Sequence, residues 1–504
     1  MGTMDNSTKQ IRIGAVISYV ALAVNIAATL LYMPWMVSVI GKANYAMYTL
    51  AYSFVNIFVM DFGLSNSVSK FIAQYRAEGS VQKENEFMAT VSKVYLILDA
   101  VMAAILLVLF FFIDVIYTGL TAEEIRTFRS LYLIVASYAV VSFPFMPLSG
   151  VMYAYEKVIE TKLCEMFQKL FTIVLVIAAL LYQADVKFVM LANVFSALIA
   201  LAAKFYIVKR GTHIRLKLSL ANLAMFREVA GFTVWIAVQI LAQRCIFTLA
   251  PNILGIVATS GDIAVFSPAN SIESYFVSLA MAINGFFIMR ITKYIVSDEK
   301  EQLYQLLLKV GRFQVLLLGM VYVVFVCVGD TFMCAWMGVD FRISWPCAAL
   351  IMLPDILIYS EQVADTAAVA SNLVKYQALG NVIMAVVCVL LSFPLSSVFG
   401  AIGASAAIAV SYVVLFVYNN ILYSRKVGLA MGRFLKECYG KLILPVLAAG
   451  AAGFFLCNKL ILIEGWTGVI IKACVASAVY VLVMFSFLNR QEKEMIIGLL
   501  KRNR

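Results

Sequence analysis

The sequence predicts an all-α integral membrane protein with about fourteen transmembrane helices. Of its 504 residues, 63% are hydrophobic and 13% are charged, whereas a soluble protein carries about 25% charged residues. A helix crosses the bilayer with roughly 20 apolar residues, and runs of this kind follow one another with only short connections. Strands of a membrane barrel would instead alternate polar and apolar residues over about 10 positions. The connections leave no room for a separate catalytic domain.

The expected spans follow the apolar runs along the chain. The N-terminal segment shows no small-residue cleavage site, so it is expected to be a first span rather than a signal peptide. The only histidine, His213, lies in a charged connection and is expected to be solvated. The expected spans are 11–37, 44–72, 89–113, 129–149, 163–182, 187–208, 229–256, 262–289, 312–333, 345–371, 376–393, 399–423, 441–462 and 467–488.

The distribution of Lys and Arg predicts that both termini lie in the cytoplasm. With this orientation the cytoplasmic connections and tails carry 30 of the 39 cations and the outer connections carry six. Positive charge concentrates on the cytoplasmic side of membrane proteins. The net charge of +11 is therefore interpreted as anchoring charge beside anionic lipid, not as a nucleic-acid surface.

An internal repeat with an offset of 217 residues relates the first span to the seventh. Gly14 aligns with Gly231 and Pro34 with Pro251. The offset covers six spans, so both copies have the same orientation and predict two six-helix lobes related by an axis along the membrane normal. The predicted divisions are 1–210 for the N-lobe, 211–428 for the C-lobe, and 429–504 for two additional spans and a cytoplasmic tail.

Motifs at the two ends of the second span carry a family resemblance. The span opens on Ala43-Asn44-Tyr45-Ala46-Met47-Tyr48-Thr49 and closes on Asp61-Phe62-Gly63-Leu64, leading to Lys70; the second copy offers the looser Gly261-Asp262-Ile263-Ala264-Val265-Phe266. With these motifs and its topology, the chain resembles the polysaccharide (O-antigen type) flippase family of the multidrug/oligosaccharidyl-lipid/polysaccharide (MOP) exporter superfamily.

The resemblance implies a V-shaped pair of lobes, as in the superfamily's multidrug antiporters, around a central cavity. It also implies export of an undecaprenyl-diphosphate-linked oligosaccharide across the bacterial inner membrane for cell-surface polysaccharide biosynthesis. The expected partners are the bilayer, the lipid-linked glycan and other membrane proteins of glycan assembly. No cofactor or metal is expected beyond coupling to H⁺ or Na⁺.

Arg244 is the clearest candidate for substrate binding. It lies near the middle of the seventh span, where a charged side chain costs roughly 2.5–3.5 kcal/mol on insertion scales. A guanidinium in a wet cavity can hold a diphosphate with two hydrogen bonds. The alternative is a structural ion pair with Glu273, which lies at a similar depth in the eighth span.

Carboxylates within the spans are the candidates for ion coupling. Glu361 and Asp365 are four residues apart in the tenth span and so share one helix face. Asp61 and Asp99 lie at similar depths in the second and third spans, and Glu273 in the eighth span is a further candidate. Buried carboxylates carry protons in exchange transport; the alternatives are helix-packing contacts for the first pair and neutralisation of nearby lysines for the second.

Three further cations are candidates for the cavity and its inner opening. Lys169 in the fifth span either lines the cavity or extends toward the cytoplasm. Lys70 and Arg290 are related by the repeat at the cytoplasmic ends of the second and eighth spans. They either capture headgroup phosphates or serve as ordinary anchoring charges.

Two other functions compete with the glycan flippase. The sequence shows no phosphate-binding loop, histidine cluster or nucleophile–base arrangement, so no enzymatic activity is expected. A multidrug antiporter of the same superfamily is the nearest alternative, although the first span carries no charge. The lipid II flippase branch also has fourteen helices, but the first two spans lack a cluster of arginines. A non-transporting scaffold for glycan synthesis would have no need for buried charge.

The Arg244→Ala substitution separates the two roles of Arg244. If the guanidinium binds the diphosphate, cell-surface glycan is lost while the abundance of folded protein stays near normal. Glycan can be measured by surface staining and abundance by immunoblotting of membranes. An equal loss of folded protein would instead support the structural ion pair.

Overall fold

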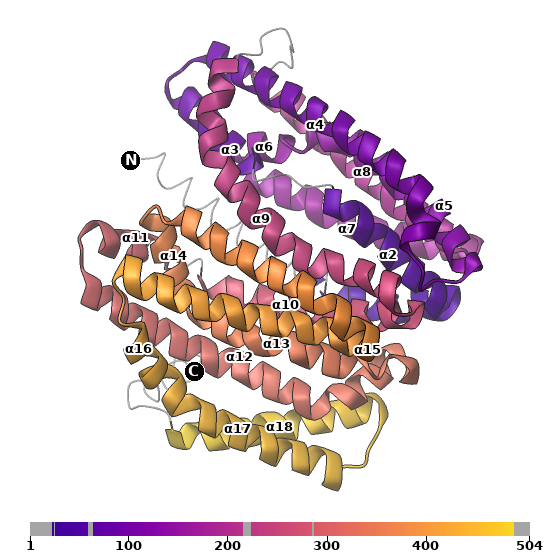
Figure 1. Cartoon of the computed structure of the whole chain (residues 1–504), viewed down its shortest axis with the longest axis vertical. Coiled ribbons are helices and arrows are strands. Elements are labelled where there is room, and N and C mark those ends of the chain that lie inside the picture. Colours follow the sequence, from indigo (N-terminus) through magenta and orange to yellow (C-terminus); the bar gives the residue numbers. More distant parts are fainter. Residues whose placement is uncertain (1–22, 25, 59–63, 215–222, 285–286, 488–504) are drawn as a thin grey trace. The chain divides into compact units, whose positions relative to one another are not determined.

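The computed structural model describes residues 23–487, apart from residues 25, 59–63, 215–222 and 285–286. Every regular element in this part is a helix, and the chain forms two compact units, Met1–Ala264 and Val265–Arg504 (Figure 1). Nine described helices are long and apolar enough to cross a membrane, or eleven with two bent pairs included. The all-α membrane fold is confirmed, and the count of fourteen spans stays a prediction.

Unit 1 begins with a helix over Ile26–Ile40 that meets the next helix at 117°. Gly41 lies between them at a φ of +83°, which glycine adopts without strain. The helices that follow are α2 (Lys42–Phe58), α3 (Leu64–Ala77), α4 (Val81–Ile116), α5 (Ala122–Ser142), the 3-10 helix η1 (Phe143–Phe145), α6 (Leu148–Ala154), α7 (Val158–Tyr182), α8 (Val186–Gly211) and α9 (Leu223–Val257).

Unit 2 takes in most of α10 and all later helices, and α17 and α18 pack together against α12 (Figure 1). The helices are α10 (Ser260–Asn284), α11 (Ile288–Val296), α12 (Lys300–Met337), the 3-10 helix η3 (Val339–Phe341), α13 (Ser344–Ser360), α14 (Gln362–Ala370), α15 (Val374–Leu422), α16 (Met431–Phe434), α17 (Gly440–Phe455) and α18 (Gly465–Phe487).

Helix α9 packs within unit 1, against α2, α3 and α4. Tyr117, which follows α4, donates a 2.8 Å hydrogen bond to Asn252 in α9. Gly255 lies against the Tyr117 ring, with no room for a side chain. These contacts join the predicted seventh span to unit 1, whereas the repeat assigned that span to the C-lobe; the lobe divisions at 210 and 428 stay a prediction.

Helix boundaries in the two units follow the same spacing. Helices α4 and α12 begin at Val81 and Lys300, and α7 and α15 at Val158 and Val374, offsets of 219 and 216 residues. Each unit also has an Asp–Arg ion pair at the end of its longest early helix, Asp114 with Arg129 and Asp330 with Arg342. The shared spacing agrees with two copies of one helical pattern.

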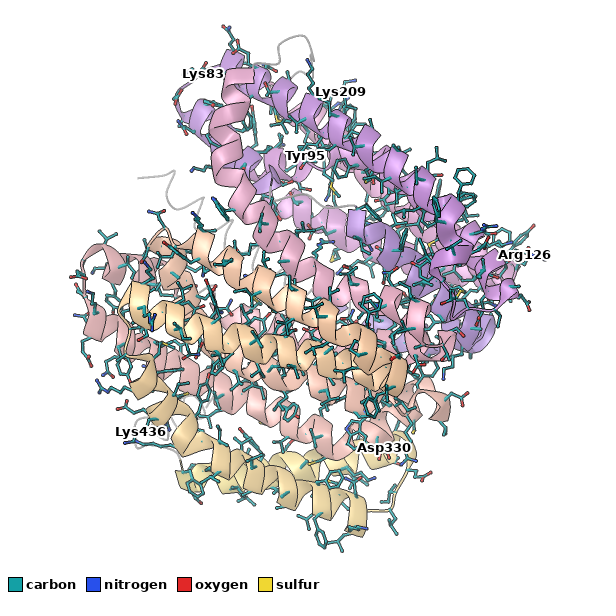
Figure 2. All side chains as sticks on the ribbon, viewed as in Figure 1. Lys83, Tyr95, Arg126, Lys209, Asp330 and Lys436 are labelled. Atoms are coloured by element: carbon teal, nitrogen blue, oxygen red, sulfur yellow. The ribbon has the colours of Figure 1, made fainter. Side chains whose placement is uncertain are left out.

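Charged side chains gather at the ends of the helices. In Figure 2, Lys83 and Arg126 lie at opposite ends of unit 1, and Lys436 and Asp330 at opposite ends of unit 2. The distribution of Lys and Arg predicts that Lys83 and Lys436 face the cytoplasm. A capping box at Thr121 and Glu124 starts α5 beside Arg126, because each residue hydrogen-bonds the backbone of the other.

Helix α15 contains the predicted eleventh and twelfth spans, and the chain turns back between them. Gly400 adopts a φ of +56° at the turn. Tyr418, near the end of α15, donates a hydrogen bond to the carbonyl of Tyr376 near its start, so the two halves run antiparallel. Just after the turn, a Cβ on Gly403 would lie only 1.9 Å from the carbonyl oxygen of Leu395.

We expect Gly403→Ala to destabilise unit 2 by about 1–3 kcal/mol, because the added methyl group must push two backbone segments apart. Gly450→Ala in α17 is the matched control, since the nearest atom to its added Cβ is a Val323 methyl carbon at 3.7 Å. The melting temperature of the purified protein in detergent measures the effect. Equal melting temperatures for the two variants would contradict the close approach.

Candidate functional site

Two buried carboxyl groups of the described residues lie together in unit 2. Glu273 in α10 is 4% exposed and Asp355 in α13 is 1% exposed. Their carboxyl groups are hydrogen-bonded to each other. Because an ionised carboxylate only accepts hydrogen bonds, this contact requires a proton on one of the two groups. The two carboxyl groups therefore form a pair that can hold one proton between them.

Helices α10, α13 and α15 build the surroundings of this pair. Ser344 at the start of α13 donates a hydrogen bond to the carbonyl of Val265, which ties α13 to the start of α10. The phenol groups of Tyr359 and Tyr412 lie close enough to both carboxyl groups to interact with them electrostatically. Asp355 Oδ2 is buried and accepts no hydrogen bond from an N–H or hydroxyl group of any described residue.

Glu361 and Asp365 form a second polar cluster, also in unit 2. Glu361 is 2% exposed and lies at the break between α13 and α14. Its Oε1 accepts a 2.8 Å hydrogen bond from Asn420. Asp365 Oδ1 accepts hydrogen bonds from Gln377 at 2.7 Å and from Tyr423 at 3.1 Å. The Asp365 backbone N–H donates a 3.1 Å hydrogen bond to the carbonyl of Glu361, so the two residues lie one helical turn apart, and their role in ion coupling stays a prediction.

The two clusters differ in how well their carboxylates are satisfied. Glu361 and Asp365 each accept hydrogen bonds from neutral side chains, as buried polar groups in a packed structure do. Glu273 Oε2 accepts a 3.5 Å hydrogen bond from Ser274, whereas Asp355 shares its hydrogen bond with Glu273, and no N–H or hydroxyl group of a described residue donates to Asp355 Oδ2. A bound proton, water or small cation would complete the pair. Among the described carboxylates, this pair is the better suited to exchange an ion.

Asp355 lies within the packed interior of unit 2, although the sequence alone did not single it out as a candidate for ion coupling. Asp355 follows Pro354 inside α13, well away from the start of the helix at Ser344. The signal in the sequence was an acid inside an apolar run. What the sequence could not supply was its neighbour on another helix.

The candidates of unit 1 are less buried. Asp99 lies on α4, and its Oδ1 is buried with no hydrogen-bond partner among the described residues. Asp61 lies outside the described residues, so the predicted pairing with Asp99 stays a prediction. Lys169 is exposed on α7, and its two predicted positions stay open.

The cationic candidates are all exposed. Arg244 lies on α9 in unit 1, and Glu273 lies in unit 2, where its carboxyl group contacts Asp355. An ion pair of Glu273 with Arg244 stays a prediction. Lys70 on α3 lies 5.6 Å from the centre of the Phe71 ring. Arg290 is exposed on α11.

One polar network near the ends of the helices of unit 1 was missed in the sequence. Glu84 in α4 is 2% exposed and accepts a 2.5 Å hydrogen bond from Tyr155, which follows α6. The Arg76 guanidinium lies 4.7 Å from the centre of the Tyr155 ring. Arg76 lies in α3, Glu84 in α4 and Tyr155 just after α6, so only the tertiary structure brings them together.

A similar network occurs in unit 2. Tyr304 in α12 donates a 3.0 Å hydrogen bond to Glu437, which also accepts one from Arg433. The Arg433 guanidinium lies 4.6 Å from the centre of the Tyr304 ring. An Arg–Tyr–Glu contact thus fixes the first turns of α12 to the segment that leads into α17, as the other network fixes α4 to the end of α6.

The sequence model of a family described as polysaccharide biosynthesis protein matches residues 13–292, which is more than half of the chain. A comparison with curated proteins gave no match.

Solved structures with the same fold belong to membrane transporters. The lipid II flippase MurJ, in an inward closed conformation, aligns with a TM-score of 0.71 and 13% identity over 94% of this chain and 98% of its own. An inward-facing multidrug resistance MATE family transporter of the MOP superfamily aligns with a TM-score of 0.67 and 14% identity. The alignment covers 81% of this chain and 98% of the transporter. A MOP superfamily transporter from Pyrococcus furiosus aligns with a TM-score of 0.55 and 14% identity, over 82% of this chain and 95% of its own. The chain therefore has the MOP-superfamily fold.

A double-mutant cycle can test whether Asn420 supports Glu361. We expect Asn420→Leu to lower stability by about 1–3 kcal/mol, because Glu361 then stays buried without its hydrogen-bond donor. Adding Glu361→Leu should restore much of the loss, since both polar partners are then absent. Melting temperatures in detergent report both steps. If the double variant is as unstable as the sum of the single ones, the two side chains do not act as a pair.

Proposed function

The chain belongs to the polysaccharide biosynthesis protein family, and from this premise we propose that it moves an undecaprenyl-diphosphate-linked oligosaccharide across the bacterial inner membrane. The family match over residues 13–292 is the observation that carries the proposal. The described apolar helices and the MOP-superfamily fold support a transport protein rather than an enzyme.

In the proposed cycle the sugar-diphosphate head passes through the protein by alternating access while the lipid tail stays in the bilayer. Arg244 is the proposed contact for the diphosphate, because its planar guanidinium donates two parallel hydrogen bonds to phosphate oxygens. Lys169, Lys70 and Arg290 are proposed to attract the head, since exposed cations raise the local concentration of an anionic substrate.

We assign ion coupling first to Glu273 and Asp355. Their mutual hydrogen bond holds a proton, and taking that proton away leaves two buried negative charges side by side. Such a state is strongly unfavourable unless the surrounding helices move or a cation enters. Binding and release of H⁺ or Na⁺ at this pair would thereby favour different conformations of unit 2. Glu361 and Asp365 remain the second candidates.

The multidrug antiporter is the alternative within the superfamily, and the similarity to MATE transporters supports the shared fold only. The family match favours the glycan cargo. Glycosyltransferase genes beside the gene for this chain would add to that preference, and their absence would favour the antiporter. A non-transporting scaffold is disfavoured by the buried carboxyl pair, since such a role gives no reason to retain it.

Purified protein in liposomes tests both the cargo and the coupling. When a fluorescent undecaprenyl-diphosphate oligosaccharide is placed in both leaflets, its inner-leaflet fraction becomes accessible to an external glycosidase only after it crosses the bilayer. We expect wild-type protein to accelerate this crossing, with a rate that depends on an imposed pH or Na⁺ gradient. The paired substitutions Glu273→Gln and Asp355→Asn keep a hydrogen bond but remove both titratable groups, so the gradient dependence should disappear.

The paired substitutions Glu361→Gln and Asp365→Asn are the matched comparison. If these alone flatten the gradient dependence, coupling belongs to the second cluster. A protein that transports an organic cation but leaves the lipid-linked glycan untouched would overturn the proposed cargo. Crossing rates equal to those of protein-free liposomes, for correctly folded protein, would favour the scaffold.

A further inference from the structure

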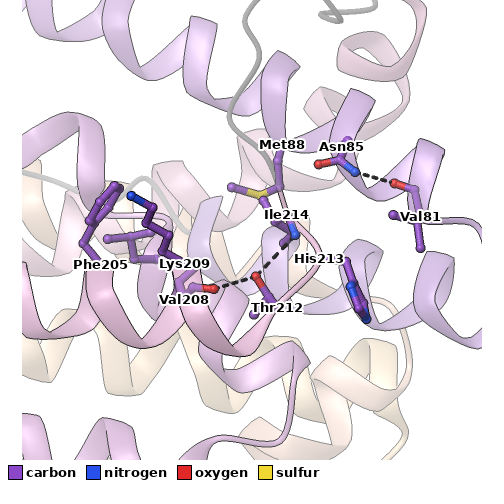
Figure 3. Close-up of a pocket in the computed structure, with 10 residues that line it drawn as sticks. Val81, Asn85, Met88, Phe205, Val208, Lys209, Thr212, His213 and Ile214 are labelled. Atoms are coloured by element: carbon purple, nitrogen blue, oxygen red, sulfur yellow. Dashed lines mark hydrogen bonds between the residues drawn. The ribbon is translucent and has the colours of Figure 1, made fainter.

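A pocket of about 680 Å³ lies in unit 1, where the start of α4 meets the end of α8. Side chains from α4, α6, α8 and the three residues after α8 line it (Figure 3). Its walls are largely apolar and include Met88, Leu148, Phe205 and Val208. None of the candidates for glycan binding or ion coupling lies in this lining.

Hydrogen bonds fix the turn that closes one side of the pocket. Thr212 donates a 2.8 Å hydrogen bond to the carbonyl of Val208, and its hydroxyl oxygen accepts one from the backbone N–H of Ile214 (Figure 3). The backbone of His213 is hydrogen-bonded to Tyr155, the same side chain that binds the buried Glu84. The turn is therefore attached to α4 and α6 as well as to α8, so the pocket is preformed.

The pocket is cationic. Of the described residues, Lys209 and His213 line it and no carboxylate does. Among the described ion pairs, none involves Lys209. A second ammonium group lies close by, because the Lys157 side chain packs over Gly211 at the end of α8. This combination of ammonium groups and an imidazole favours an anion with several oxygen acceptors.

The pocket lies at the boundary of the apolar spans. Its residues on α4 come from the first two turns, before the span predicted at 89–113, and its residues on α8 from the end of the span predicted at 187–208. This is the end of unit 1 that carries Lys83, which the distribution of Lys and Arg assigns to the cytoplasm. A ligand here can place an anionic group near Lys209 while its apolar part contacts Phe205 and the bilayer.

From this placement we propose that the pocket binds the phosphate-bearing head of a lipid of the cytoplasmic leaflet. Two lipids share this chemistry, an anionic phospholipid of the bulk bilayer and a polyprenyl diphosphate. Lys209 and His213 contact the phosphate oxygens, and Met88, Leu148 and Phe205 contact the glycerol or first isoprene groups. The inference does not depend on the proposed cargo, because either lipid meets the same groups.

Native mass spectrometry of the full-length protein in phosphatidylcholine nanodiscs can test the proposal. One series is titrated with phosphatidylglycerol and the other with undecaprenyl diphosphate, which separates the two sources. The double variant Lys209→Ala with His213→Ala should lower the apparent affinity about tenfold for the lipid that binds. Arg210→Ala is the matched control, because Arg210 is the adjacent cation but does not line the pocket. Its guanidinium lies 5.0 Å from the centre of the Tyr206 ring instead.

A second variant tests whether binding requires the volume of the pocket. Asn85→Trp places a large side chain at the wall without changing charge, and the half-buried position of Asn85 on the surface of α4 lets the protein fold. We expect Asn85→Trp to reduce binding as strongly as the loss of the cations, while Arg210→Ala binds as wild type. The proposal is overturned if neither lipid binds, if Arg210→Ala weakens binding equally, or if Asn85→Trp leaves it unchanged.

Discussion

The hydrocarbon interior of a bilayer offers no hydrogen-bond partner, and this constraint shapes nearly every feature of the chain. Backbone N–H and C=O groups must be satisfied within their own segment, so the described part of the chain is helical almost throughout. The helices are interrupted where the local residues permit it. Gly41 and Gly400 turn the chain with positive φ values. Glu361 lies between two helices, and its side chain accepts a hydrogen bond from Asn420.

The same constraint explains why the polar interior of unit 2 is informative. Burying an isolated charge costs several kcal/mol, so each buried carboxylate needs a donor, a proton or a cation. Glu361 and Asp365 have donors from Asn420, Gln377 and Tyr423. Glu273 accepts a hydrogen bond from Ser274, and Asp355 shares its hydrogen bond with Glu273. A pair that is satisfied only when it holds a proton responds to the gain or loss of an ion, whereas a carboxylate with permanent donors mainly stabilises its helices.

The ends of the helices follow different rules, because water and lipid headgroups are present there. Arg–Tyr–Glu contacts join separate segments in both units, through Tyr155 in one and Tyr304 in the other. In unit 1 this contact also fixes the turn beside the cationic pocket. Polar networks that would be costly in the membrane interior can thus define binding sites at its boundary, where long cationic side chains remain hydrated.

The sequence by itself determined the membrane fold, because apolar runs of span length have few other stable states. It also identified Glu273, Glu361 and Asp365, since an acid inside an apolar run is visible without a structure. The partners were decided by tertiary structure alone. Asp355 meets Glu273 from another helix, and Glu84 meets Tyr155 across 71 residues. Residue spacing fixes which side chains share one helix face, but which faces meet depends on how helices pack, and short periodic patterns do not encode that packing.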